Sequence, residues 1–141
     1  TSKADIVVAF EEVPRADVVR YGIAKPRGAV GARFELEDLI EKPSVAEAPS
    51  TYAVASRYVL SPAIFEALEE TEPGKGGEIQ LTDAIRILLK RGAKGVGMVL
   101  PADERRFDIG NYGSYFRAFA DFALADPDYG DQLRDYLRGI L

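Results

Sequence analysis

The sequence predicts an α/β fold in which a mixed sheet is flanked by helices. A continuous apolar run at residues 6–10 is typical of a strand buried on both faces. Residues 34–37 and 52–60 alternate in side-chain character with a period of two, which is typical of further strands. Helical patterns lie later in the chain. Because strands and helices do not alternate strictly, we expect a mixed sheet.

The first half of the chain is expected to begin with the strand at 6–10, followed by a polar loop to residue 20. Residues 21–24 form a short strand, ended by a turn at 25–28 whose proline and glycine favour a change of direction. The strand at 34–37 pairs back on it. The alternation breaks at 38–40, which predicts a bulge or bend before Glu41.

A loop at 44–50 precedes the strand at 52–60, which we expect to be interior because both of its faces are mostly apolar. Ser61 and Pro62 are typical of the N-cap and first position of a helix that runs to about residue 70. Its buried residues are expected to be Ile64, Phe65 and Leu68. The glycine-rich loop 72–77 lacks the Gly-Lys-Ser/Thr ending of a nucleotide-binding P-loop and does not directly follow a strand.

A second helix is expected to begin at Thr82, whose hydroxyl can cap it, with Asp83 complementing the helix dipole. It ends at residues 90–92, and a strand follows at 96–100. The buried face of this helix should comprise Ala84, Ile85, Leu88 and Leu89.

Two helices, at about 112–125 and 129–141, are expected to end the chain, and Asn111 can cap the first. Their apolar stripes predict core positions or a subunit interface. The stripes are Phe116, Phe119, Ala120 and Ala123 in one helix and Leu133, Tyr136, Leu137 and Ile140 in the other.

The composition is that of one globular domain, with 141 residues, 47% hydrophobic and 29% charged. The net charge of −5, with scattered basic residues, argues against a nucleic-acid partner, and no uncharged run approaches the roughly 18 residues that cross a bilayer. The absence of cysteine fits a cytoplasmic protein. The absence of histidine excludes Ser-His chemistry within the chain and leaves oxygen ligands for any metal, which favours magnesium, calcium or manganese.

The chain opens without methionine and enters the apolar strand within five residues. A buried central strand normally has elements before it. We therefore expect this chain to be a piece of a larger protein.

Candidate chemistry begins at residues 39–43, where an apolar run brings Glu41 and Lys42 to the carboxyl end of a strand that Pro43 terminates. Ligands of open α/β sheets bind at that end. The proline should also push Lys42 toward extended backbone geometry. On their own, these two residues are also typical of a solvated strand tip.

Asp108 and Gly22 are the other candidates. The Asp108 carboxylate is a hard ligand suited to magnesium, but it could instead belong to the following helix cap or pair with Arg106. Gly22 in mid-strand indicates either a bulge or the close approach of a ligand to the backbone. A carboxylate for hydroxyls, a lysine for phosphate and an aspartate for magnesium together indicate a sugar-phosphate and nucleotide site, which tolerates the lack of histidine.

Seven segments carry a family resemblance: residues 11–14, 20–23, 39–43, 48–50, 57–60, 76–85 and 108–111. Read in order, they resemble bacterial UTP–glucose-1-phosphate uridylyltransferases, also called UDP-glucose pyrophosphorylases. The resemblance covers residues 1–141 and corresponds to the C-terminal, sugar-phosphate-binding half of such an enzyme. It implies the C-terminal half of a nucleotide-diphospho-sugar transferase (Rossmann-like) fold.

The resemblance implies a role for each candidate. Glu41 would bind sugar hydroxyls, and Lys42 would bind the hexose phosphate and act as the catalytic residue. Gly22 would lie against the sugar through its backbone, Val54 would lie near the ring, and Asp108 would be one of two carboxylates on Mg²⁺. The implied reaction converts UTP and glucose 1-phosphate into UDP-glucose and pyrophosphate, and a homo-oligomer is implied as well.

The family's N-terminal half carries the glycine-rich triphosphate loop, the base-recognising residues and a second magnesium aspartate, and it has no counterpart here. We therefore do not expect this chain to catalyse the reaction alone. Two alternatives stay open: a glucose-1-phosphate thymidylyltransferase of the same superfamily, and a catalytically silent sugar-nucleotide-binding or oligomerisation module. Base choice depends on the missing half, so an assay of both nucleotides on the complete protein tests the first alternative. The upstream sequence tests the second, because the enzyme requires a glycine-rich phosphate loop and a second aspartate there.

Overall fold

The computed structural model describes residues 3–101, 103–104, 106–107 and 109–141. Its contacts divide the chain into two compact units, Thr1–Glu104 and Arg105–Leu141, which are described separately. The predicted α/β fold, with a mixed sheet and flanking helices, is confirmed in the first unit.

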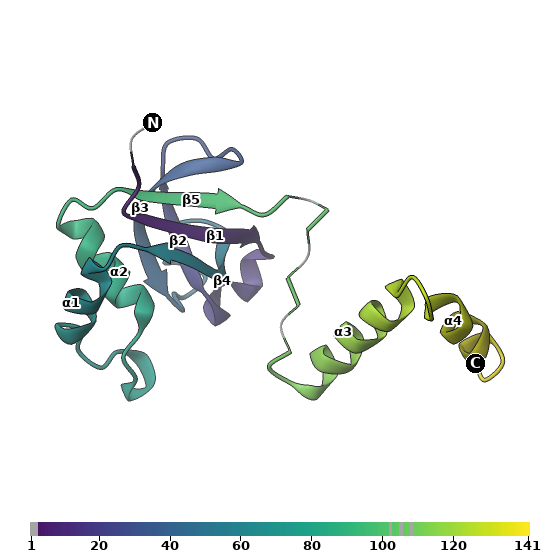
Figure 1. The fold of residues 1–141 in the computed structure, drawn as a ribbon. Helices are drawn as coiled ribbons and strands as arrows, with labels where there is room; N and C mark the ends of the chain where they lie inside the picture. The colour runs from purple at the N-terminus through teal and green to yellow at the C-terminus, as the bar shows by residue number, and fades with distance from the viewer. Residues whose placement is uncertain (1–2, 102, 105, 108) are drawn as a thin grey trace. The chain divides into compact units, whose positions relative to one another are not determined.

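The sheet of the first unit closes on itself (Figure 1). Its strands, within the described residues, are β1 (Ile6–Glu12), β2 (Gly22–Arg27), β3 (Arg33–Glu41), β4 (Tyr52–Leu60) and β5 (Gly95–Val99), in the spatial order β1-β4-β2-β3-β5. β5 pairs with β3 and also returns to β1. The β1–β5 pair is parallel and the remaining pairs are antiparallel, so the sheet is mixed.

Helices α1 (Ala63–Glu69) and α2 (Leu81–Lys90) pack together, and α2 also packs against β3 (Figure 1). Short 3-10 helices, η1 (Arg15–Arg20) and η2 (Lys75–Gly77), lie in the connections. Phe65 was expected inside, and that expectation is wrong: its side chain is 69% exposed. Ile64 and Ala67 are buried because their i, i+3 spacing puts them on one face of α1, whose centre lies more than a third of a turn from Phe65.

The turn expected at residues 25–28 is also wrong, because β2 continues through Pro26 to Arg27. The register shifts between Lys25 and Pro26, leaving Glu37 as the extra residue on β3. A proline is tolerated there because the ladder is interrupted at the bulge. Lys25 donates a 2.7 Å hydrogen bond to Glu37, and this bond lowers the pKa of the Glu37 carboxyl.

The core of the first unit contains a row of aromatic rings that crosses the sheet interior. The ring of Phe34 lies 5.4 Å from that of Phe10 and 5.9 Å from that of Tyr52, centroid to centroid. Gly97 faces Phe34 across the β3–β5 pair, and the ring occupies the space that a side chain at Gly97 would need. The small residue on β5 therefore lets a large ring fill the core.

The second unit contains α3 (Tyr112–Ala125) and α4 (Gly130–Arg138). Asn111 caps α3, as predicted, with Oδ1 accepting a 3.0 Å hydrogen bond from the Ser114 amide. Phe116 and Phe119 were expected inward, but they are 63% and 64% exposed. The buried hydrophobic residue of α3 is the small Ala118.

Tyr136 of α4 and Ile140, which follows this helix, are exposed as well, so these residues are not core positions, and the alternative expectation of a subunit interface stays a prediction. Within the described part of the chain, no helix is both long enough and apolar enough to span a membrane.

Candidate functional site

A cleft of ≈ 220 Å³ lies where the end of β3 meets the starts of β2 and α2 and the middle of β4. Its lining residues are Arg20, Tyr21, Gly22, Glu41, Val54, Ser56, Tyr58, Gln80, Leu81 and Thr82. Three residues predicted to bind substrate, Gly22, Glu41 and Val54, are thus brought to one place. Lys42 adjoins them, with Nζ 3.6 Å from Glu41 Oε1. Asp108 lies outside the described residues.

Gly22 forms the tightest point of the cleft. It pairs directly with Glu41 in the β2–β3 ladder, so Gly22 is not in a bulge, and the bulge of this pair lies at Glu37 of β3, opposite Lys25 and Pro26. A Cβ atom at Gly22 would lie 2.8 Å from Thr82 Cγ2, 3.1 Å from Glu41 Oε2 and 3.3 Å from Val54 Cγ2. A side chain therefore does not fit, and the backbone itself forms this part of the wall.

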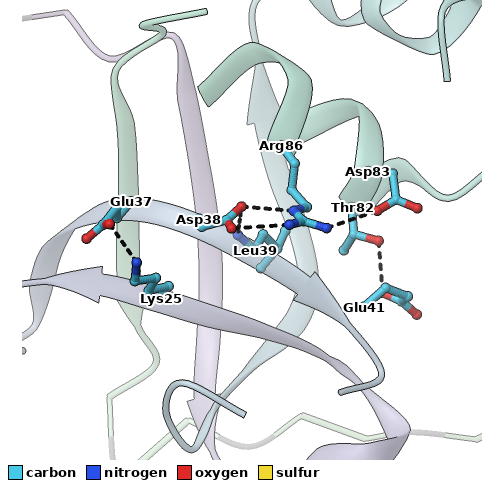
Figure 2. Close-up of polar contacts among 8 residues, drawn as sticks. All are labelled: Lys25, Glu37, Asp38, Leu39, Glu41, Thr82, Asp83 and Arg86. Atoms are coloured by element: carbon cyan, nitrogen blue, oxygen red, sulfur yellow. Dashed lines mark hydrogen bonds and ion pairs between the residues drawn. The ribbon is translucent and has the colours of Figure 1, made fainter. Parts of the chain in front are cut away.

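The Glu41 carboxylate is held between two partners. Thr82 Oγ1 donates a 2.9 Å hydrogen bond to Glu41 Oε2, as Figure 2 shows, while Oε1 faces the Lys42 ammonium. The Glu41 side chain is 16% exposed and lines the cleft. The prediction that Thr82 caps α2 is wrong, because α2 begins at Leu81 and the Thr82 hydroxyl crosses to β3 instead.

Lys42 has a backbone geometry that the sequence did not predict. Its φ is 44°, in the left-handed region, where extended geometry had been expected. The Lys42 amide donates a 2.9 Å hydrogen bond to the Tyr21 carbonyl, which continues the strand pairing for one residue while the chain bends away. A left-handed non-glycine residue costs on the order of 1–3 kcal/mol and persists where the surroundings fix it.

Ser56, within β4, shares this feature with a φ of 56°. It lies in a bulge, because three residues of β4 face Ala9 alone in the pairing with β1. Among the described residues, Lys42 and Ser56 are the two non-glycine positions with positive φ, and both are at the cleft. Strain of this kind gathers at functional sites, so its location supports the choice of this cleft.

Sequence reasoning assigned no role to Tyr58, although it follows Val54 at a spacing of four on β4. Burial, and secondly the charge of Glu41, raise the pKa of the Tyr58 phenol. The phenol of a tyrosine is protonated at neutral pH, so Tyr58 brings a hydrogen-bond donor to the lining of the cleft. The period-two pattern of β4 was the available signal, since Val54, Ser56 and Tyr58 all line the cleft.

An ion pair clamps α2 to β3 one helical turn beyond Thr82. Arg86 donates to both carboxylate oxygens of Asp38, from Nε to Oδ1 at 3.0 Å and from Nη2 to Oδ2 at 3.3 Å (Figure 2). Asp38 Oδ1 also accepts from the Leu39 amide at 2.8 Å. Because the two side chains are only 31% and 24% exposed, this bidentate pair is stronger than an ordinary surface pair.

We expect Arg86→Ala to lower the free energy of unfolding by about 1–2 kcal/mol, since it removes a partly buried bidentate pair. Arg27→Ala is the matched control, because Arg27 pairs with Glu35 while both side chains are more than 60% exposed. The control should cost less than about 0.5 kcal/mol. Urea unfolding measures both changes. Equal losses of unfolding free energy in the two variants would contradict a special role of the Arg86–Asp38 pair in holding α2 on β3.

The described residues contain no group of three or more acidic, histidine or cysteine side chains that could hold a metal. The predicted ligand Asp108 is outside them.

A larger cavity, of ≈ 740 Å³, lies along β3, β5 and the end of α2, and shares no lining residue with the cleft. It contains none of the predicted site residues. Its charged lining includes Arg27 and Glu35, which pair with each other at 3.2 Å. We assign the site to the smaller cleft because the candidate residues and the strained backbone gather there.

The family model described as nucleotidyl transferase matches residues 1–124. The chain belongs to the nucleotidyl transferase family. The UTP–glucose-1-phosphate uridylyltransferase of a Staphylococcus epidermidis strain is 36% identical to it over 134 residues, which cover 95% of this chain and 46% of the relative. This nucleotidyl transferase chain thus spans about half the length of the curated relatives it matches.

Solved structures agree with this membership. A UDP-glucose pyrophosphorylase complexed with UDP-glucose superposes with a TM-score of 0.76 at 38% identity, covering 83% of this chain and 43% of its own. The UDP-glucose pyrophosphorylase of Acinetobacter baumannii superposes with a TM-score of 0.82 at 28% identity, and the match covers 99% of this chain and 47% of that protein's chain. The nucleotide-sugar transferase fold predicted from the sequence is therefore confirmed.

Proposed function

We propose that this chain forms the sugar-phosphate side of the active site of a UTP–glucose-1-phosphate uridylyltransferase. The observation that carries the proposal is the cleft that unites Gly22, Glu41 and Val54, with Lys42 at its edge. The names of the relatives and the UDP-glucose in one solved neighbour support the same assignment.

In the proposed reaction, an oxygen of glucose 1-phosphate attacks the α-phosphorus of UTP. The new oxygen–phosphorus bond replaces the bond to the β-phosphate oxygen, and pyrophosphate leaves with that electron pair. No covalent enzyme intermediate is required. The protein's task is to orient the two substrates and to stabilise negative charge on the transferring group.

Five residues in or beside the cleft have a part in that task. Lys42 places a positive charge at the sugar phosphate, and Glu41 accepts hydrogen bonds from sugar hydroxyls through Oε1. Val54 packs against the ring. Gly22 lets the sugar approach the β2 backbone, and Tyr58 supplies a protonated hydroxyl.

Magnesium is part of the proposal, with Asp108 as one of its ligands. When bound, the ion would supply positive charge at the substrate phosphates. Cytoplasmic location and a homo-oligomeric state belong to the same proposal. All three points rest on the family resemblance.

The test is an assay of pyrophosphate release by the full-length protein that carries this chain. With glucose 1-phosphate, we expect kcat/KM for UTP to exceed that for dTTP by at least about tenfold, and chelation of divalent ions to stop the reaction. A preference for dTTP would identify a thymidylyltransferase. Binding of UDP-glucose without turnover of either nucleotide would identify a silent binding module.

A further inference from the structure

Thr82 is a buried polar residue at the cleft, with 5% of its surface exposed. Its two branches have different contacts. Oγ1 donates to Glu41 Oε2 at 2.9 Å, and Cγ2 lies 2.8 Å from the position of a Cβ atom on Gly22. One side chain on α2 thus contacts the carboxylate at the end of β3 and covers the backbone at the start of β2.

The contact to Glu41 restricts a flexible side chain. A glutamate has three side-chain torsions, and holding it in one orientation costs conformational entropy that a ligand would otherwise have to offset. A hydrogen bond to one carboxylate oxygen fixes that orientation in advance. It also uses one acceptor position of Oε2, while Oε1 lies beside Lys42.

Thr82 is itself held in place by the helix that carries it. Arg86, one turn further along α2, is bonded to Asp38, three residues before Glu41 on β3. The two cross-links run between the same two elements, as Figure 2 shows. The Arg86–Asp38 pair therefore holds α2 at a fixed distance from β3, and this keeps the Thr82 hydroxyl within hydrogen-bonding distance of the Glu41 carboxylate.

We propose that Thr82 is a positioning residue for sugar recognition. Its hydroxyl orients Glu41 toward the sugar hydroxyls, and its methyl group forms the wall that limits how closely the sugar meets Gly22. This inference rests on the proposed function. It assigns to Thr82 an effect on the sugar and no direct effect on the phosphate.

Thr82→Val replaces the hydroxyl with a methyl group of similar size and so separates the two roles. We expect the affinity for glucose 1-phosphate to fall about 5- to 20-fold, because Glu41 loses its fixed orientation. The affinity for inorganic phosphate, which probes Lys42 alone, should change less than about twofold. NMR titration of the chain with each ligand measures both values.

Two controls distinguish positioning from general damage. Thr82→Ser keeps the hydroxyl and should retain glucose 1-phosphate affinity within about threefold of the wild-type chain. Thr71→Val makes the same change at the other buried threonine in the described part of the chain, whose hydroxyl donates to the Ala67 carbonyl at 2.7 Å. Thr71→Val should lower the unfolding temperature without changing the affinity for either ligand.

The wall over Gly22 is tested without any ligand. Gly22→Ala should lower the unfolding temperature, because its methyl group meets Thr82 Cγ2. In a Thr82→Ser background that methyl contact is gone, so Gly22→Ala should cost measurably less. If Gly22→Ala lowers the unfolding temperature equally in the wild-type and Thr82→Ser backgrounds, the Thr82 methyl group does not form the wall over Gly22.

The outcomes separate this inference from the proposed function. If the wild-type chain binds glucose 1-phosphate and Thr82→Val binds it equally well, the role of Thr82 is wrong and the proposed function stands. If Thr82→Val weakens both ligands alike, Thr82 acts only on the fold and the inference also fails. If the wild-type chain binds neither glucose 1-phosphate nor UDP-glucose, the proposed function of this chain fails, and the sugar-positioning role of Thr82 fails with it.

Discussion

Lys42→Ala is expected to weaken binding of UDP-glucose to this chain by about 10- to 100-fold. The ammonium adjoins the cleft, and a charge-assisted contact to a phosphate is worth roughly 1.5–3 kcal/mol. The backbone of Lys42 is left-handed, so the chain bends at this residue. The hydrogen bond from the Lys42 amide to the Tyr21 carbonyl stabilises the bend. Calorimetric titration with UDP-glucose in the presence of magnesium measures the change.

Lys25→Ala is the matched control for this loss of charge. Lys25 lies on β2 and bonds to Glu37, and neither residue lines the cleft. Its removal lowers the net charge equally, and its ammonium is paired with Glu37 and not directed at the cleft. Affinity should therefore change less than about twofold. Similar losses in both variants would show that Lys42 acts through overall charge and not as a site residue.

Gly97→Ala is expected to give the largest loss of stability, about 2–3 kcal/mol in the free energy of unfolding. The added methyl group overlaps the Phe34 ring. That ring is 5% exposed and is packed against Phe10 and Tyr52, so it has nowhere to move. Urea unfolding of the chain measures the difference.

Gly31→Ala provides the comparison. A Cβ atom at Gly31 would meet no atom closer than the Arg33 carbonyl oxygen at 3.9 Å. Its unfolding free energy should stay within about 0.5 kcal/mol of the wild-type value. If Gly97→Ala proved as mild as Gly31→Ala, the packing described for the aromatic row would be incorrect.

Local patterns in the sequence predicted the elements they directly specify. The strand at 52–60 has the predicted limits, because alternation and flanking loop residues define both of its ends. The N-cap of α3 at Asn111 was predicted for the same reason. Glu41 and Lys42 were predicted together at the end of a strand that Pro43 terminates, and β3 ends at Glu41, one residue before Lys42.

Features that depend on distant partners were not predictable in this way. Closure of the sheet requires β5 to return to β1 across almost the whole first unit, and no local pattern specifies that pairing. The positive φ of Lys42 depends on the Tyr21 carbonyl, and that of Ser56 on a bulge opposite β1. Both are set by strand pairing and not by residue type.

The candidate site shows the same division. The cleft residues Gly22, Glu41 and Val54 were found from motif and resemblance, whereas Thr82 was taken for a helix cap. A threonine at the start of a helix is usually a cap, and only the packing of α2 on β3 turns its hydroxyl toward Glu41. The signal for its actual role is three-dimensional.

The most direct test of the central claim is an amide NMR titration of this chain with glucose 1-phosphate. We predict saturable shifts that are largest at Gly22, Lys42, Val54 and Thr82, with small changes around the larger cavity near Arg27 and Lys94. This pattern would locate sugar-phosphate binding in the cleft at the end of β3. Saturable shifts confined to the larger cavity, or no saturable shift at all, would contradict the assignment of this cleft as the sugar-phosphate site.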